Sequence, residues 1–288
     1  MNYCLIPCYQ RPEMLYFALK KIELAEGSEN LKYVFNLDIG FNHTVLSVIR
    51  GFKYFKNSEI RPKKHGEFQG HKDAKQSYNL LEGYLYCAQR TDDLVYMIED
   101  DIMVSNDFFK FHEHAHMVFG ESFCSIAVKN PNRKIYETEN CLESIYATSN
   151  DYCSLGVCFN KEIINKYIAP HINKEYFKDP YKYVESQFPK SGISGSFCEQ
   201  DGLIRRTQMG LDLPIIYPVV PRAYHAGYYG KNRKKYLTGS YEKKKAMVEK
   251  IIFDDEQMRL NAMIPEYYED SRPVNLTIEH WDNLKLIN

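Results

Sequence analysis

Apolar runs of strand length alternate with helical patterns along the first part of the chain. The apolar runs occupy residues 3–7, 31–37 and 94–98, and the helical patterns occupy residues 12–22, 45–55, 73–88 and 107–119. Pro12 suits the first turn of the first helix, and Asp107 can accept hydrogen bonds from the free N–H groups that begin the last one. This alternation predicts an α/β fold with a mostly parallel sheet flanked by helices.

The pattern is irregular in the second half of the chain. Strands are predicted at residues 123–128, 145–147 and 213–221, and helices at residues 161–168, 197–209 and 240–253. The basic, glycine-containing stretches 61–72 and 222–235 are typical of loops, and residues 176–189 have no clear pattern. No shift in composition marks a linker, so we expect one continuous domain with an irregular C-terminal half.

Three consecutive carboxylates, Glu99, Asp100 and Asp101, follow the apolar run at residues 94–98. Carboxylates at the end of a buried strand repel one another and are costly to desolvate unless a cation compensates them. Oxygen ligands suit Mg²⁺ or Mn²⁺, and the carboxyl end of a parallel strand is where open α/β sheets bind ligands. The motif therefore indicates a divalent-cation site, with a solvated acidic turn as the alternative.

Composition limits the classes of function that fit. The chain has 288 residues, 44% hydrophobic and 26% charged, with a formal net charge of -1, so it is not a nucleic-acid binder by charge alone. Its eight cysteines have no zinc-finger spacing. Many lie inside apolar runs, where a free cysteine acts as a small hydrophobic residue, and this favours a reducing compartment. The first residues do not resemble a signal peptide, and no apolar stretch approaches the ~20 residues of a membrane span. We expect a cytoplasmic protein.

The beginning of the chain, I-P-C-Y-x-R-P-E, resembles the first strand and loop of GT-A glycosyltransferases, and I-E-D-D-I resembles their DxD-type metal motif. The resemblance is greatest to the N-acetylglucosaminyltransferase I family, which transfers GlcNAc from UDP-GlcNAc to glycans. Blocks similar to that family follow in its order at residues 36–44, 65–70, 95–111, 199–205 and 218–230. Gly202 replaces a bulky aromatic residue, one residue is inserted before Arg205, and residues 151–196 show no match.

The resemblance implies roles on the donor side of a Rossmann-like, GT-A type site. Asp101 would bind Mn²⁺ or Mg²⁺, Asp100 the ribose, and Glu99 the sugar or a metal-bound water. Asp38 would accept from the uracil or ribose, although aspartate beside Gly40 is also a common turn residue.

Two basic side chains complete this donor side. Arg11, just past the first strand, is placed to reach the base or diphosphate, and His65 matches the loop histidine that contacts the nucleotide. An idle surface charge and a solvent-exposed histidine are the structural alternatives.

The same resemblance assigns Asp201 as the general base, with Glu199 as the second candidate; a carboxylate at a helix start can equally be a cap. His225 lies in a glycine-flanked loop and could be a second metal ligand or a diphosphate contact. The loop through residues 228–233 could close over the donor, with Gly227 and Gly230 as hinges, or be an ordinary surface loop.

These features predict a metal-dependent, inverting transferase that moves a hexosyl or N-acetylhexosaminyl group from a UDP-sugar to a hydroxyl of a saccharide acceptor. Residues 1–120 would bind the nucleotide sugar, and residues 121–288 would bind the acceptor and close the site. Three alternatives stay open. One is a transferase acting on a hydroxylated DNA base, whose phosphates would contact local basic clusters. The others are a nucleotidyltransferase and a non-catalytic nucleotide-sugar binder.

Overall fold

A computed structural model describes residues 1–128, 145–148, 152–188, 199–211, 213–218, 221–227 and 237–254. These residues form an eight-stranded sheet in the order β3-β2-β1-β4-β8-β6-β9-β7, and a separate two-stranded sheet of β5 and β10. The large sheet contains β1 (Asn2–Cys8), β2 (Leu31–Leu37), β3 (Glu59–Pro62), β4 (Leu94–Met97), β6 (Cys124–Ile126), β7 (Ile145–Thr148), β8 (Val157–Asn160) and β9 (Ile215–Pro218). The small sheet contains β5 (Ile102–Val104) and β10 (Ala223–His225).

The sheet is mostly parallel, as the alternation of strands and helices predicts. β3, β2, β1 and β4 are parallel neighbours, and β6 and β9 are parallel to each other. β8 is antiparallel to both β4 and β6, and β7 is antiparallel to β9. The strands of the second half of the chain thus complete the sheet that the first half begins. The predicted α/β fold is confirmed.

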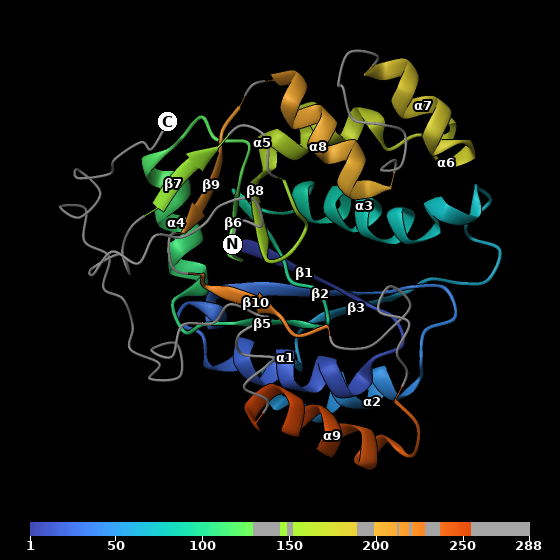
Figure 1. Cartoon of the computed structure of the whole chain (residues 1–288), viewed down its shortest axis with the longest axis vertical. Coiled ribbons are helices and arrows are strands. Elements are labelled where there is room, and N and C mark those ends of the chain that lie inside the picture. The colour runs from blue at the N-terminus through green and yellow to red at the C-terminus, as the bar shows by residue number, and fades with distance from the viewer. Residues whose placement is uncertain are drawn as a thin grey trace.

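Helices cover both faces of this sheet (Figure 1). The longer ones are α1 (Pro12–Leu24), α2 (Thr44–Gly51), α3 (Lys75–Ala88), α4 (Phe108–Val118), α8 (Gln200–Leu211) and α9 (Tyr241–Asp254). Short helices α5 (Lys161–Ile163) and α6 (Lys174–Lys178) follow β8, and α7 (Pro180–Gln187), which is as long as α2, comes after them. α1 and α2 lie on one face with α9 beyond them, whereas α3 and α8 lie on the opposite face.

Two predicted loops are wrong in part, and one predicted helix cap is wrong. Residues 61–72, expected to be a loop, begin inside the edge strand β3, and residues 222–235 contain β10. Edge strands often carry charged residues and proline, as β3 does, so their pattern is not that of a buried strand. Asp107 makes no side-chain cap at the start of α4. It accepts instead from Ser105 Oγ and from Arg222 Nε, both at 2.5 Å, because a charge-assisted hydrogen bond is the stronger one.

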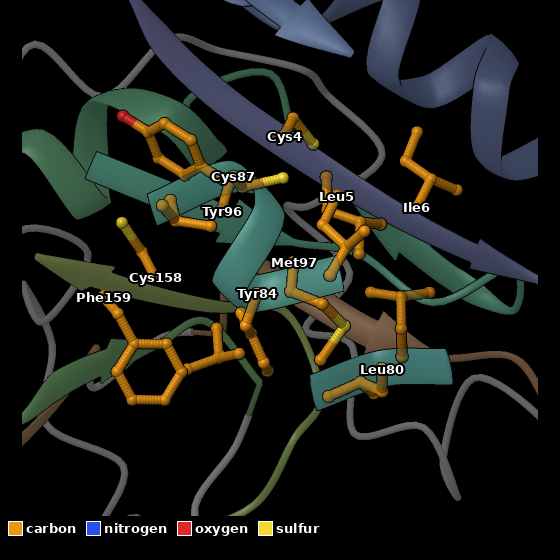
Figure 2. Close-up of a cluster of buried hydrophobic side chains, with 14 of the residues drawn as sticks. Cys4, Leu5, Ile6, Leu80, Tyr84, Cys87, Tyr96, Met97, Cys158 and Phe159 are labelled. Atoms are coloured by element: carbon orange, nitrogen blue, oxygen red, sulfur yellow. The ribbon is translucent and has the colours of Figure 1, made fainter. Parts of the chain in front are cut away.

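One part of the main core fills the space between α3 and strands β1, β4 and β8 (Figure 2). Tyr84 of α3 packs edge-to-face on Phe159 of β8, with ring centroids 5.3 Å apart. α3 lies so close to the sheet that a Cβ atom at Gly83 would be 2.8 Å from both Leu5 Cδ1 and Asn36 Nδ2. Burial of these rings and aliphatic side chains holds α3 firmly against the carboxyl ends of the strands.

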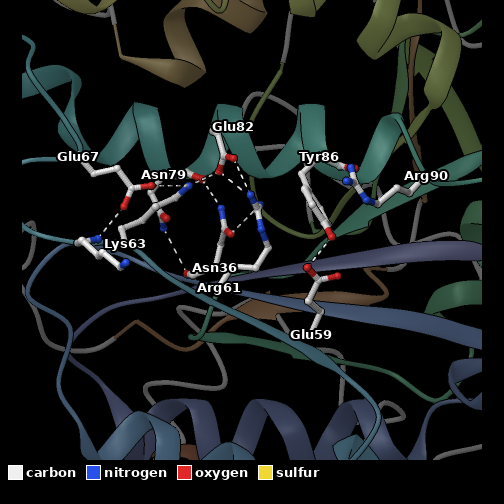
Figure 3. A network of polar contacts seen from close by, with 10 residues as sticks. Asn36, Glu59, Arg61, Lys63, Glu67, Asn79, Glu82, Tyr86 and Arg90 are labelled. Atoms are coloured by element: carbon white, nitrogen blue, oxygen red, sulfur yellow. Dashed lines mark hydrogen bonds and ion pairs between the residues drawn. The ribbon is translucent and has the colours of Figure 1, made fainter.

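A polar network ties α3 to β2 and β3 beside the core (Figure 3). Asn36 Nδ2 donates to the Asn79 carbonyl at 2.7 Å, and Arg61 donates to Asn36 Oδ1 at 3.1 Å and to Glu82 Oε1 at 2.6 Å. Lys63, which is buried, pairs with the same Glu82 carboxylate. Burial opposes ionisation of Glu82, but hydrogen bonds from Arg61 and Lys63 hold its pKa below the ordinary value. The network therefore fixes the strand ends that precede the candidate site.

The structure also bears on two expectations drawn from composition. The cysteines in the described ranges are all free thiols, namely Cys4, Cys8, Cys87, Cys124, Cys153 and Cys158. Within the same ranges, no helix combines the length and the apolar character that crossing a membrane requires.

Candidate active site

The carboxyl ends of three neighbouring parallel strands bring most of the predicted donor-side residues to one edge of the sheet. β1 leads to Arg11, β2 leads to Asp38, and β4 leads to the segment Glu99, Asp100 and Asp101. β1 pairs in parallel with both β2 and β4, so all three ends point the same way. This edge is where open α/β sheets bind their ligands.

Arg11 lies across the acidic motif. Its Nη2 donates to Asp100 Oδ1 at 2.5 Å, and its Nη1 donates to Asp101 Oδ2. Asp100 and Asp101 are only 4% and 1% exposed, and Asp100 also accepts from the backbone N–H of Tyr9. The guanidinium thus neutralises two carboxylates that would otherwise be buried without compensation.

The two buried carboxylates of this pair differ in acidity. Burial by itself would raise both pKa values. At Asp101 the charges of Arg11 and His225, with their hydrogen bonds, outweigh burial and lower the pKa to about 2. At Asp100 burial dominates, the negative charge of Asp101 adds to it, and the pKa is raised to about 6 despite Arg11. Asp101 is therefore the stronger acid of the two and keeps its charge well below neutral pH.

His225 reaches Asp101 through the small sheet. The antiparallel ladder of β10 and β5 pairs His225 with Ile102, and the backbone N–H of Ala226 donates to the Asp101 carbonyl at 2.8 Å. His225 Nε2 then lies 2.9 Å from Asp101 Oδ2. Two residues that are more than a hundred positions apart in the sequence are thereby held side by side.

Gly227 allows this close approach. A Cβ atom at that position would overlap both Nε2 of His225 and Oδ2 of Asp101. No side chain larger than hydrogen fits there unless the two site residues move. The sequence suggested Gly227 as a hinge, and the structure shows that a side chain at this position would collide with His225 and Asp101.

The Asp101–His225 pair suits a hard divalent cation. Oδ1 of Asp101 is buried and has no hydrogen-bond partner among the described residues, so a charged oxygen lone pair is left unsatisfied. In the described ranges no group of three ligating side chains gathers around one point. Mg²⁺ and Mn²⁺ accept such a site, because they complete their coordination with water and substrate phosphates. Asp101 and His225 would be the protein ligands.

Asp201 comes to the same edge from the opposite face of the sheet. It is the second residue of α8, and Ser77 of α3 holds the start of that helix. Ser77 Oγ accepts from the backbone N–H of Gln200 at 3.0 Å and donates to Gln200 Oε1 at 3.1 Å. Burial, reinforced by the charge of Glu199, raises the pKa of Asp201 to about 6, although hydrogen bonds from Ser154 and Gln200 oppose the shift.

Ser154 joins Asp201 to the acidic motif. Its hydroxyl is hydrogen-bonded to Asp201 and lies 3.4 Å from Glu99 Oε1. Burial raises the pKa of Glu99 well above its ordinary value, and the charges of Asp101, Asp201 and Asp100 raise it further. Oδ1 of Asp201 is buried without a partner in the described part of the chain. The catalytic candidate and the motif are therefore linked through one hydroxyl group.

His65 lies near Gly40, two residues after Asp38. Asp38 is nearly buried; its backbone N–H donates to the Cys8 carbonyl at 2.9 Å, and its Oδ1 accepts from the N–H of Ile39 at 2.7 Å. Burial raises the pKa of Asp38. The hydrogen bond from the Ile39 N–H and the charges of Lys75 and Lys63 lower it, but they do not outweigh burial. The His65 ring is exposed, and its Cε1 atom would lie 3.9 Å from a Cβ atom at Gly40.

Not every predicted residue enters this arrangement, and some that do were not predicted. Glu199 is exposed, and its negative charge raises the pKa of Asp201. The predicted closing residues 228–233 and the loop 191–196 lie outside the described residues. Sequence reasoning missed Ser154, Gln200 and Ser77, because isolated polar residues carry no motif. The small-residue block containing Ser154 and Gly156 was the available signal.

Comparison with known proteins gives likeness in structure only. No protein-family model matches the chain, and no curated protein matches it. The galactosyltransferase LgtC in complex with donor and acceptor sugar analogues superposes with a TM-score of 0.49 and 10% identity, over 93% of this chain and 100% of that one. TarS 1–349 of S. aureus in complex with UDP-GlcNAc gives 0.48 and 13%, over 99% and 74%. Mouse xyloside xylosyltransferase 1 gives 0.45 and 9%, over 74% and 84%. Function has to be argued from the site residues.

Proposed function

We propose that the chain is a metal-dependent, inverting glycosyltransferase of the GT-A type, which transfers a sugar from a UDP-sugar to a hydroxyl of a saccharide acceptor. One observation carries the proposal. Asp101 contacts the His225 imidazole at the end of the acidic motif, and Asp201, whose pKa is raised to about 6, is linked to Glu99 of the same motif through the Ser154 hydroxyl. The first suits the leaving diphosphate and the second suits the attacking hydroxyl.

The donor side is assigned to residues at the strand ends. A divalent cation at Asp101 and His225 would neutralise the negative charge that develops on the departing UDP. Arg11 already brings a positive charge to this position and can extend its hydrogen bonds to phosphate oxygens. Asp38 and His65 would hold the nucleoside, and Asp100 would accept from the ribose.

The acceptor side is assigned to the start of α8. Asp201 would accept the proton of the acceptor hydroxyl while that oxygen forms a bond to the anomeric carbon. The bond from the anomeric carbon to the UDP oxygen breaks at the same time, and its electron pair leaves with UDP. Attack from the face opposite the leaving group inverts the anomeric configuration. A general base works best when its pKa lies near the operating pH, and the raised pKa of Asp201 meets that requirement.

Calorimetric titration of the purified protein with UDP and UDP-sugars tests the donor assignment. We expect binding in the presence of Mn²⁺ that weakens by at least about tenfold in EDTA, with ADP- and GDP-sugars as non-binding controls. Equal UDP-sugar affinity in Mn²⁺ and in EDTA would show that the metal has no part in donor binding. Absence of UDP-sugar binding under both conditions would overturn the proposal itself.

A further inference from the structure

A small hydrophobic cluster lies apart from the main core. It consists of six buried side chains, Met14, Phe17, Ala18, Met103, Ala226 and Val248. They come from α1, β5, the residue after β10, and α9, so the cluster joins four segments that are distant in sequence.

Three of these segments each carry a donor-side residue. Met14 is three positions after Arg11, Met103 is two positions after Asp101, and Ala226 directly follows His225. The cluster is therefore the apolar support behind the residues that meet at the candidate cation site. α9 supplies none of the site residues, and its contribution to the cluster is Val248, which is 1% exposed.

The small sheet needs such support. In the described part of the chain it has two strands of three residues each, and a two-stranded ribbon by itself is marginally stable in water. α1 packs on one side of it, and α9 lies against α1 (Figure 1). The Lys245 ammonium also sits 3.7 Å from the centroid of the Tyr16 ring, which fixes α9 on α1.

We propose that Val248 is a positioning residue for the cation site. By packing in the cluster that contains Ala226, it holds the His225–Gly227 segment against Asp101 and so sets the affinity for the divalent cation. The proposal rests on the proposed function, because it concerns the metal assigned there. A gap at Val248 lets Ala226 move, and a small displacement of His225 separates it from Asp101 Oδ2.

Mn²⁺ binding to the full chain, followed by electron paramagnetic resonance with and without UDP, tests this role. Val248→Ala should weaken Mn²⁺ binding by about tenfold, whereas UDP binding in EDTA stays unchanged. The matched control is Val184→Ala in α7, a fully buried valine of the main core. It should lower the melting temperature without changing Mn²⁺ affinity. Val248→Thr replaces Val248→Ala if that variant does not fold. It leaves no gap but buries a hydroxyl in the apolar cluster, which disturbs the packing and should also weaken Mn²⁺ binding.

The outcomes separate the two proposals. Equal Mn²⁺ affinity in the wild type, Val248→Ala and Val184→Ala would overturn the positioning role and leave the metal site intact. Equal loss in both alanine variants would show a general stability effect and would also overturn it. A wild-type chain without any UDP-linked Mn²⁺ binding would overturn the proposed function and the inference with it.

Discussion

Two pairs of carboxylates share the candidate site, and they are compensated in different ways. Asp100 and Asp101 lie against a guanidinium, and Asp101 also lies against an imidazole. Glu99 and Asp201 are linked instead through the neutral hydroxyl of Ser154. Within the first pair the pKa of Asp101 is lowered to about 2, whereas burial raises that of Asp100 to about 6. In the second pair burial raises the pKa of Asp201 to about 6 and that of Glu99 well above its ordinary value.

The difference between Asp101 and Asp201 separates two kinds of chemistry within one candidate site. A carboxylate that stays charged is suited to hold a cation, and a carboxylate that titrates near neutrality is suited to exchange a proton. Glu99 and Asp101 are neighbours in one acidic triplet, yet they face different partners. Membership of a motif therefore does not decide the role of a carboxylate; its partner does.

The largest effect should come from Asp201→Asn. An amide cannot take the acceptor proton, so we expect kcat to fall by about 10²–10⁴-fold, with Mn²⁺-dependent UDP affinity unchanged. The measurement is UDP release from a UDP-sugar in the presence of saccharide acceptors. Glu199→Gln, on the same turn but exposed, is the control and should retain most activity. Full turnover by Asp201→Asn would exclude Asp201 as the base.

Asp101→Asn changes the first carboxylate pair, Asp100 and Asp101, at the proposed cation site. Losing the charged oxygen ligand should weaken UDP binding in Mn²⁺ by about 10–100-fold, because the cation loses its anionic partner. UDP binding in EDTA should not change, which calorimetry can measure directly. Asp92→Asn, at an exposed aspartate beside the N-terminus, is the control. If Asp101→Asn lowered turnover but left Mn²⁺-dependent binding intact, the division between the two pairs would be wrong.

Gly227→Ala should have a smaller effect on the same pair. The added methyl group would collide with Nε2 of His225 and Oδ2 of Asp101, so the two must separate. We expect about tenfold weaker Mn²⁺-dependent UDP binding. Gly120→Ala is the matched control, because no atom lies within 4 Å of a Cβ atom there. Equal affinities for the two variants would show that the close approach has no role in binding.

The smallest effect concerns the pH dependence of turnover. The rate should rise as Asp201 loses its proton, with a midpoint near pH 6, since the pKa of Asp201 is raised to about 6. Ser154→Ala removes a hydrogen bond that favours the charged form, so the midpoint should move upward by up to about one unit. Ser186→Ala, at an exposed serine of α7, should leave the profile in place. A downward shift in Ser154→Ala would contradict the assignment of Ser154.

Much of the first half of the molecule was predictable, and the reason lies in its local patterns. β2 covers residues 31–37 as predicted, and α1, α3 and β4 lie where periodicity indicates, because each buries a regular apolar face. The small sheet was not predictable. β10 is three residues long, and it is a strand because β5 pairs with it, not because its own residues favour one.

The residues of the candidate site also fall into those that the sequence could place and those that it could not. Residues next to strand ends, such as Asp38 and Asp101, could be placed from the sequence because parallel strands end at one edge. Ser154 and Ser77 could not, since a serine has meaning here only through the carboxylate or amide that it contacts. Arg11 was expected near the base or diphosphate, and the structure shows its guanidinium on Asp100 and Asp101.

The sequence by itself determined the strand–helix alternation, the acidic triplet at the end of β4, and hence the edge of the sheet where chemistry can occur. These are local properties, set by periodicity and by the order of residues along a strand. Only the tertiary structure decided which carboxylate is charged and which titrates. That outcome depends on burial and on the positions of Arg11, His225 and Ser154, which folding brings to the motif from distant parts of the chain.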